Sequence, residues 1–258
     1  MSVPSDGITE SDLADKLLAF RQQQDGFLVP SFNPISGSGP NGAIVHYRAI
    51  AGADRELASD DLLLLDSGGH YRDGTTDITR TIAIGTPPNG AVAAYNHVLQ
   101  SHIHLAMAKF PTGTNGKQLD AIARAPLWAA GLDFAHGTGH GVGHVLSVHE
   151  GPASISKRGD VALEAGMVLS NEPGYYQTGD WGIRIENLIV VTPAKQTGFL
   201  EFETITLCPL DRRLIDKTLL DAGEIGWIDH YHRVVYEQLH PHLSPMAQIM
   251  VRGRCCPL

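Results

Sequence analysis

Hydrophobic and polar positions follow a helical period in several segments of this 258-residue chain. Residues 9–24 begin with Thr and Ser, carry acids in the first turn and place Leu13, Leu17 and Phe20 on one stripe. A capped start followed by an apolar stripe predicts an amphipathic helix. Further helices are predicted at residues 90–109, at residues 116–130 and across residues 211–240.

Strands are predicted where apolar and polar residues alternate between turns rich in glycine and proline. Residues 61–85 predict a strand, a glycine-rich turn and a second strand, with isoleucines on one face and an acid and threonines on the other. Residues 165–191 predict a similar unit, which is followed by a strand at residues 199–207. A short upstream strand, AIVHY, is predicted at residues 43–47. This order of elements favours an α+β fold class over a regular βαβ alternation.

The composition indicates a chain that buries a core, because 43% of its residues are hydrophobic and 18% are charged. Its formal net charge of -9 argues against a nucleic-acid partner, since the 19 Lys and Arg are scattered rather than clustered. The longest aliphatic run is four leucines at residues 62–65, so no membrane span is predicted. Cys208, Cys255 and Cys256 do not suit a disulfide framework, and we expect a reducing, cytoplasmic location.

Two pairs of acids flank the turns of the two predicted strand–turn–strand units. Asp66 and Asp77 face each other if the first hairpin is centred near residues 71–72, with Cβ atoms about 5 Å apart. Glu172 and Glu186 repeat this arrangement in the second unit. A solvated surface is the alternative explanation for either pair, because acids are common at turns. However, Glu186 is embedded in an aliphatic strand, which is unusual for a surface acid.

Convergence of these four carboxylates has an electrostatic consequence. At about 5 Å and an effective dielectric constant of 20, each like-charge pair repels by about 3 kcal/mol. Several such pairs rival the whole stability of a domain, about 5–15 kcal/mol. A cluster of this kind must therefore hold protons or cations. Oxygen-rich ligation favours hard or borderline divalent ions.

The run HGTGHGVGHVLSVHEGP at residues 136–152 combines histidines with alternating glycines. His136, His140 and His144 have the spacing of one helical face, but each interleaved glycine costs a helix interior up to about 1 kcal/mol. We therefore expect an extended segment, with these histidines on one face and bare glycine on the other, where a second backbone can approach closely. A structural histidine without a ligand role is the alternative for any one of them.

Six motifs together resemble one protein family: PNGAIVHY, DSGGHYRDGTTDITRT, HGTGHGVG, VHEGP, NEPGYY and GIRIENL. Over about residues 9–240 the chain resembles the pita-bread metallopeptidases, and within them the Xaa-Pro aminopeptidases. The resemblance implies an α+β pita-bread fold, with two pseudo-symmetric halves and a curved antiparallel sheet covered by helices. It also implies a catalytic domain at residues 1–207 and a packed helical extension at residues 208–258. The N-terminal domains that precede this unit in longer relatives are expected to be absent.

The resemblance also implies roles for individual residues. It implies a dinuclear metal site in which Asp77 and Glu186 bridge the two ions. The implied ligands are Asp66, Asp77, His140, Glu172 and Glu186. His46 and His149 are expected to guide the substrate and stabilise the tetrahedral intermediate, and His136 and Arg184 to line the pocket for the proline side. His144 matches no ligand position. Two divalent ions are expected, with Mn²⁺ first and Co²⁺ or Zn²⁺ as substitutes.

The implied activity is hydrolysis of the N-terminal Xaa-Pro bond by a hydroxide that the two ions activate, with Glu172 passing a proton to the prolyl nitrogen. The implied substrate is a peptide with proline at the second position, and a homodimer is compatible with the family. One alternative is a prolidase-type dipeptidase, which shares the five ligands. A second is an inactive, truncated pita-bread domain that binds peptides or proteins. Methionine aminopeptidase is less similar.

Overall fold

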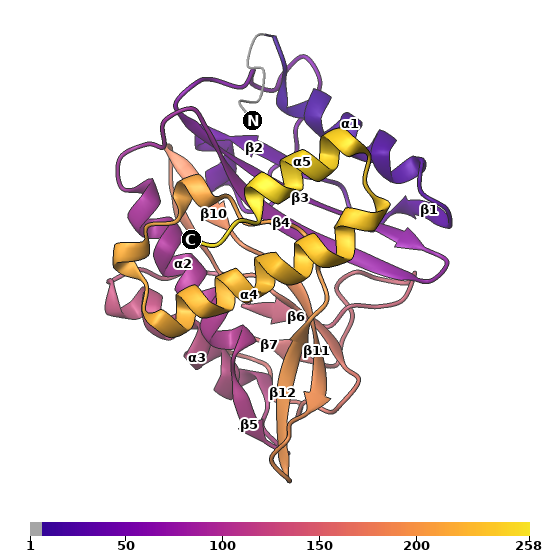
Figure 1. Ribbon diagram of the computed structural model, residues 1–258, viewed down its shortest axis with the longest axis vertical. Helices are drawn as coiled ribbons and strands as arrows, with labels where there is room; N and C mark the ends of the chain where they lie inside the picture. The colour runs from indigo at the N-terminus through magenta and orange to yellow at the C-terminus, as the bar shows by residue number, and fades with distance from the viewer. Residues whose placement is uncertain (1–6) are drawn as a thin grey trace.

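A long hairpin dominates the first sheet of the computed structural model, which describes residues 7–258. The hairpin joins β3 (Asp61–Tyr71) to β4 (Gly74–Ile84), and this confirms the predicted strand, turn and strand. On the other edge of β3, β1 (Phe27–Pro30) and β2 (Ile35–Ser38) pair with its two ends. Figure 1 shows this sheet in the upper half of the molecule.

The second sheet is antiparallel and has the strand order β5-β12-β11-β8. Its strands are β5 (Lys109–Pro111), β8 (Val168–Asn171), β11 (Asn187–Pro193) and β12 (Phe199–Thr204). Two short ladders accompany it, formed by β9 (Gly174–Gln177) with β10 (Trp181–Arg184) and by β6 (Gly139–His140) with β7 (Ser154–Ile155). The second predicted strand–turn–strand unit is thus confirmed, although it is divided between a sheet and a separate ladder.

Helices cover these sheets, and α4 runs diagonally across the face seen in Figure 1. The helices are α1 (Glu10–Gln22), α2 (Ala91–Ala106), α3 (Gly116–Ala129), α4 (Ala222–Leu239) and α5 (Pro245–Arg254). The first three confirm the predicted helices. Among residues 7–258, no helix combines the length and apolar character needed to cross a lipid bilayer.

Helix α2 provides the centre of the largest hydrophobic core. Its Tyr95, Val98 and Leu99 are completely buried, because three positions that are three or four residues apart lie on one helical face. They pack in one cluster with Ile183 of β10 and Val235 of α4. The core therefore joins the second strand–turn–strand unit to the C-terminal helices.

Helix α1 begins as predicted but buries a different side chain. Thr9 caps it in a capping box with Asp12. Phe20, expected on the apolar stripe, is 53% exposed, whereas Glu10 is completely buried. The Glu10 carboxylate accepts hydrogen bonds from the Ser38 backbone N–H at 2.6 Å and from the Tyr47 hydroxyl at 2.7 Å. The helix is thus held by a polar anchor as well as by part of its predicted stripe, since Leu13 packs against the cluster of Leu57, Leu63 and Ile84.

Three other sequence-based predictions were wrong or incomplete. The AIVHY strand does not form, because the 3-10 helix η1 (Gly39–Ala43) and the turn after it replace the strand. Between residues 211 and 220 the chain forms two short 3-10 helices, η2 (Arg212–Leu214) and η3 (Lys217–Leu219), and α4 starts only after the Asp221 cap. Helix α5 was not predicted, although Ser244 caps it and proline occupies its first position.

His232 of α4 makes the stability of this fold sensitive to pH. The imidazole is fully buried, and its Nε2 accepts a hydrogen bond from the Leu210 backbone N–H at 3.1 Å. Burial, followed by the positive charges of Arg212 and Arg80, lowers the pKa of His232 to about 4. The unfolded chain binds this proton near pH 6.5, so the unfolding free energy falls as the pH drops from about 6.5 to about 4.

Replacement of this imidazole tests the effect. We expect the wild-type chain to lose about 2 kcal/mol more unfolding free energy than His232→Gln between about pH 7 and about pH 4.5. Urea denaturation at both pH values measures the difference. His230→Gln, at an exposed position of the same helix, is the control and should behave like the wild type. Equal acid losses in the wild type and His232→Gln would contradict the prediction.

Candidate metal centre

The register of the β3–β4 hairpin differs from the predicted register by two residues. Asp66 pairs with Thr79, and Asp77 pairs with Gly68, so the two acids are diagonal rather than direct neighbours. The difference arises because the turn lies at residues 72–73 instead of 71–72. A shift of two residues leaves a side chain on the same face of the sheet. Both acids therefore still point toward one site.

The second acid pair lies where two ladders meet. Asn171 pairs with Asn187 in one ladder, and Gly174 pairs with Arg184 in the other, so the two ladders share one register. Glu172 occupies a position opposite Glu186 in the gap between them. The backbone N–H groups of both acids donate to other segments instead. The N–H of Glu186 donates to Thr79 O in the first half of the chain at 3.1 Å, and the N–H of Glu172 donates to Thr138 O in the histidine run at 2.8 Å.

Buried polar contacts bring the two pairs together. The Thr79 hydroxyl donates to Glu186 Oε2 at 2.8 Å, and Arg80 donates to the backbone oxygen of Glu186 at 2.6 Å. Arg184, which is 2% exposed, donates to Asp66 Oδ2 at 2.6 Å. Each contact joins β4 or β3 to the second strand–turn–strand unit. The four acids Asp66, Asp77, Glu172 and Glu186 thus form one group, here called the acid cluster.

The glycines of the histidine run allow other backbone segments to approach it closely, as predicted. A Cβ atom on Gly139 would lie 2.0 Å from Ser170 O, and one on Gly141 would lie 2.1 Å from Glu150 O. Only glycine allows such close backbone approach. Helix α3 fixes the start of the run through buried Arg124, which donates to His136 O at 2.7 Å. The prediction of an extended segment with a close backbone approach is therefore confirmed, although its regular strand is only two residues long.

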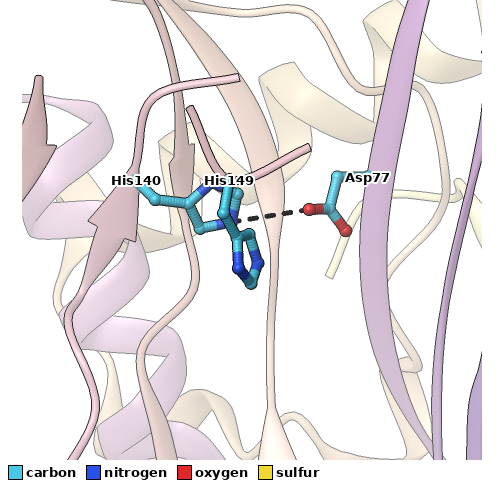
Figure 2. Close-up of side chains that lie close together, drawn as sticks. All are labelled: Asp77, His140 and His149. Atoms are coloured by element: carbon cyan, nitrogen blue, oxygen red, sulfur yellow. Dashed lines mark ion pairs between the residues drawn. The ribbon is translucent and has the colours of Figure 1, made fainter. Parts of the chain in front are cut away.

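His140 turns its Nε2 toward the acid cluster. Its Nδ1 lies 3.0 Å from Gly141 O, which leaves Nε2 at 3.5 Å from Asp77 Oδ2 and 3.2 Å from Glu172 Oε1. Burial lowers the pKa of His140, but hydrogen bonds to Asp77 and Glu172 outweigh burial and raise it to about 11. Figure 2 shows His140 directed at Asp77 from the facing segment, with His149 beside it at a ring separation of 3.9 Å.

Burial raises the pKa of three of these carboxylates, but the groups around them give different net shifts. Burial, reinforced by the charges of Asp77 and Glu172, raises the pKa of Glu186 well above its ordinary value. Burial also raises the pKa of Asp66, to about 7, although Arg184 opposes the shift. Burial raises the pKa of Glu172 too, but its hydrogen bond with His140 and the charge of that imidazole lower it to about 2 overall. Protons therefore compete with cations mainly at Asp66 and Glu186.

The geometry of the acid cluster fits two cations. One set of ligand atoms lies within 4.8 Å of one another in Asp66, Asp77 and Glu186. A second set with the same spacing belongs to His140, Glu172 and Glu186. Asp66 Oδ1 is buried and has no hydrogen-bond partner in the described part of the chain, which costs about 1–3 kcal/mol if no other group satisfies it. Carboxylate oxygens with a single imidazole suit hard or borderline divalent ions.

A cavity of about 470 Å³ opens onto the acid cluster. Its wall includes all the residues that the sequence placed in the site, namely His46, Asp66, Asp77, His136, His140, His149, Glu172, Arg184 and Glu186. His144 does not line the cavity, and its Nε2 instead lies 3.2 Å from Arg72 O at the β3–β4 turn. The histidine run is thus shared between the cavity and the outer surface.

Tyr176 is a site residue that sequence reasoning did not single out. Its hydroxyl accepts from Arg184 Nη1 at 2.7 Å and lies 2.8 Å from His136 Nε2. Burial, the largest effect, raises the pKa of Tyr176 to about 12, so the hydroxyl keeps its proton and donates it to the imidazole. The NEPGYY motif already contained this tyrosine, but only its contacts with His136 and Arg184, which line the cavity, show that it belongs to the site.

Comparison with known proteins supplies independent information. Residues 1–193 match metallopeptidase family M24, and residues 198–252 match the C-terminal region of that family. Aminopeptidase P2 of Arabidopsis thaliana is 49% identical over 92% of this chain and 34% of its own length. The likeness thus extends over nearly all of the chain.

Solved structures agree with this likeness. An X-prolyl aminopeptidase from Caenorhabditis elegans, described as a cytosolic enzyme with a di-nuclear active site, has a TM-score of 0.93 and 42% identity over 97% of this chain. The prolidase from Pyrococcus furiosus has a TM-score of 0.69 and 32% identity over 78% of this chain. The present chain spans only 42% of the former structure and 56% of the latter.

These findings confirm the α+β pita-bread fold and the resemblance to Xaa-Pro aminopeptidases that the motifs indicated. The family match extends over both strand–turn–strand units, and so over every residue of the acid cluster. This chain belongs to metallopeptidase family M24.

Proposed function

We propose that this chain carries a metalloaminopeptidase activity that hydrolyses the N-terminal Xaa-Pro bond of peptides. The convergence of the acid cluster and His140 on one cavity is the observation that carries the proposal. The relatives named aminopeptidase P and X-prolyl aminopeptidase support the choice of reaction. In this proposal, residues 1–207 form the catalytic domain and residues 208–258 a helical extension packed on it.

Five residues would hold two divalent cations. The first ion would be bound by Asp66, Asp77 and Glu186, and the second by His140, Glu172 and Glu186. Asp77 also lies near the second set, with its Oδ2 3.5 Å from His140 Nε2. Mn²⁺ is the proposed ion, and Co²⁺ or Zn²⁺ could replace it at such ligands. When bound, the two ions supply Lewis-acid activation of water and of the peptide carbonyl.

Glu172 is placed to move a proton. Its Oε1 accepts from the Ser170 hydroxyl at 2.9 Å and lies 3.2 Å from His140 Nε2. Oε2 is therefore the oxygen that would take the proton of the attacking water and deliver it to the prolyl nitrogen.

His149 and His46 would act on the substrate itself. Burial, followed by the positive charge of His140, lowers the pKa of His149, so that its imidazole is neutral at neutral pH. A neutral imidazole can donate one hydrogen bond to the oxygen of the tetrahedral intermediate. His46 lies on the exposed part of the cavity wall, where it can guide an entering peptide.

The proline ring would bind beside His136 and Arg184. Tyr176 holds both side chains, with its hydroxyl 2.8 Å from His136 Nε2 and 2.7 Å from Arg184 Nη1. Phe134 packs against the His136 ring at a centroid separation of 4.8 Å. Aromatic and imidazole faces at fixed positions suit the rigid, largely apolar pyrrolidine ring.

The remaining parts of the proposal concern location and assembly. A cytoplasmic location is supported by the cytosolic relative from Caenorhabditis elegans and by cysteines that form no disulfide in the described residues. A homodimer is compatible with the family. The second candidate reaction is that of a prolidase, which cleaves Xaa-Pro dipeptides, and the likeness to the Pyrococcus furiosus prolidase supports it less strongly.

Metal binding provides the first test. We expect the chain to bind two Mn²⁺ ions, and Glu186→Gln to weaken both sites because this carboxylate belongs to both ligand sets. Asp66→Asn should weaken only one site. Calorimetric titration with Mn²⁺ and metal analysis measure the stoichiometry, and Glu164→Gln at an exposed position is the control. A folded wild-type chain that binds no Mn²⁺, Co²⁺ or Zn²⁺ would refute the metal site.

Peptide hydrolysis tests the reaction. After reconstitution with Mn²⁺, we expect cleavage of an Xaa-Pro-Xaa tripeptide between the first two residues and no cleavage of an Xaa-Pro dipeptide. A chelator should abolish the activity, because the acid cluster alone cannot activate water. Chromatographic detection of the released amino acid measures both reactions. Preferential cleavage of the dipeptide would favour the prolidase reaction instead.

Replacement of Glu172 tests its proton transfer, and metal analysis shows whether the ion that Glu172 would also help to hold is retained. Glu172→Gln preserves the shape of the side chain but removes its basicity, so kcat should fall by about 10²–10⁴-fold. Circular dichroism and metal analysis show whether the fold and the ions persist. Glu164→Gln again provides the matched control. Undiminished turnover by Glu172→Gln would exclude the proposed proton transfer.

A further inference from the structure

Arg48 places an unused positive charge on the wall of an acidic cavity. It lines the same cavity as the acid cluster, and its side chain is exposed. Within residues 7–258, its guanidinium makes no ion pair or hydrogen bond. The other cavity arginine, Arg184, is already occupied by Asp66, Tyr176 and Thr79. Arg48 is thus the cavity guanidinium that remains available for an anion.

The loop that carries Arg48 is fixed by contacts on its opposite side. The neighbouring Tyr47 donates its hydroxyl proton to Glu10 Oε2 at 2.7 Å, and Asn41 Nδ2 donates to the same carboxylate at 3.0 Å. The Tyr47 backbone N–H also donates to Ile44 O at 3.0 Å. The residue before Arg48 is therefore anchored, whereas the Arg48 side chain is exposed.

The cavity wall carries charges of both signs, which differ in burial. The buried floor carries the acid cluster, where cations and the free amine of a substrate would bind, whereas Arg48 lies on the exposed wall next to Tyr47 and His46. An unblocked short peptide has the matching charges, with an amine at one end and a carboxylate at the other. A tripeptide spans about 10 Å when extended, at about 3.3–3.6 Å per residue. A guanidinium can bind a carboxylate through two parallel hydrogen bonds.

We propose that Arg48 binds the C-terminal carboxylate of short Xaa-Pro peptides and so gives this site a preference for short, unblocked substrates. This inference rests on the proposed peptidase activity and adds a substrate class to it. Arg48 would hold the end of the peptide that leaves after cleavage. It would influence mainly KM, because the carboxylate lies away from the bond that is cleaved.

Kinetics with matched substrates test the proposal. We expect an Xaa-Pro-Xaa tripeptide to have a kcat/KM about 10-fold higher than its C-terminal amide, through a lower KM. Arg48→Met should raise the KM of the acid to that of the amide and leave cleavage of the amide unchanged. Arg48→Lys should retain part of the preference, because it keeps the charge but not the two parallel hydrogen bonds. Arg158→Met removes an exposed arginine outside the cavity wall and should change neither substrate.

Three outcomes would overturn the inference. Equal kinetics of acid and amide in the wild type would do so, as would a preference for the acid that survives Arg48→Met. A third test substrate is a tripeptide amide with aspartate as its third residue. If it is cleaved as efficiently as the tripeptide acid, the recognised carboxylate can belong to a side chain and need not be the C-terminus. If neither peptide is cleaved, the proposed activity fails. Calorimetric binding of acid and amide to the wild type and Arg48→Met then decides the role of Arg48 separately.

Discussion

Mutual repulsion among four carboxylates, three of them buried and Glu172 partly buried, is the constraint on which the rest of this structure depends. Asp66, Asp77 and Glu186 have ligand atoms within 4.8 Å of one another, and Glu172 joins Glu186 in a second set of the same size. Such a cluster is stable only if positive charge, protons or cations compensate it. Arg184 and His140 supply part of that charge from the protein, while burial and the neighbouring acids raise the pKa of Glu186.

Buried polar groups outside the acid cluster hold the segments that build the cavity. Arg80 ties β4 to the backbone of Glu186 and of Cys208, Arg124 ties α3 to the histidine run, and Glu10 ties α1 to Tyr47. Removal of one partner from a buried charged contact is costly, because the other partner is left without compensation. Positions in the site are thus fixed by hydrogen bonds between distant segments as well as by the apolar core.

The agreement between sequence and structure depends on how local each feature is. The β3–β4 hairpin and helices α1, α2 and α3 were predictable, because the hydrophobic periods and end signals that indicate them lie within short segments of the sequence. The pairing of Asp66 with Thr79 was not, because a turn displaced by one residue at its centre moves the register by two. The segment at residues 43–47 has a strand-like composition, yet its contacts with Glu10 and η1 overrule that local preference.

The sequence by itself determined which residues are the candidates for the chemistry, since the motifs of the family contain all five proposed ligands and the histidines around them. It also determined that close backbone approach would be needed at the alternating glycines, because that property belongs to the residue type. Only the tertiary structure decided which oxygen faces which partner, that Tyr176 joins His136 to Arg184, and that Arg48 on the cavity wall has no partner among residues 7–258. Those features depend on contacts between segments far apart in the chain, which no local pattern encodes.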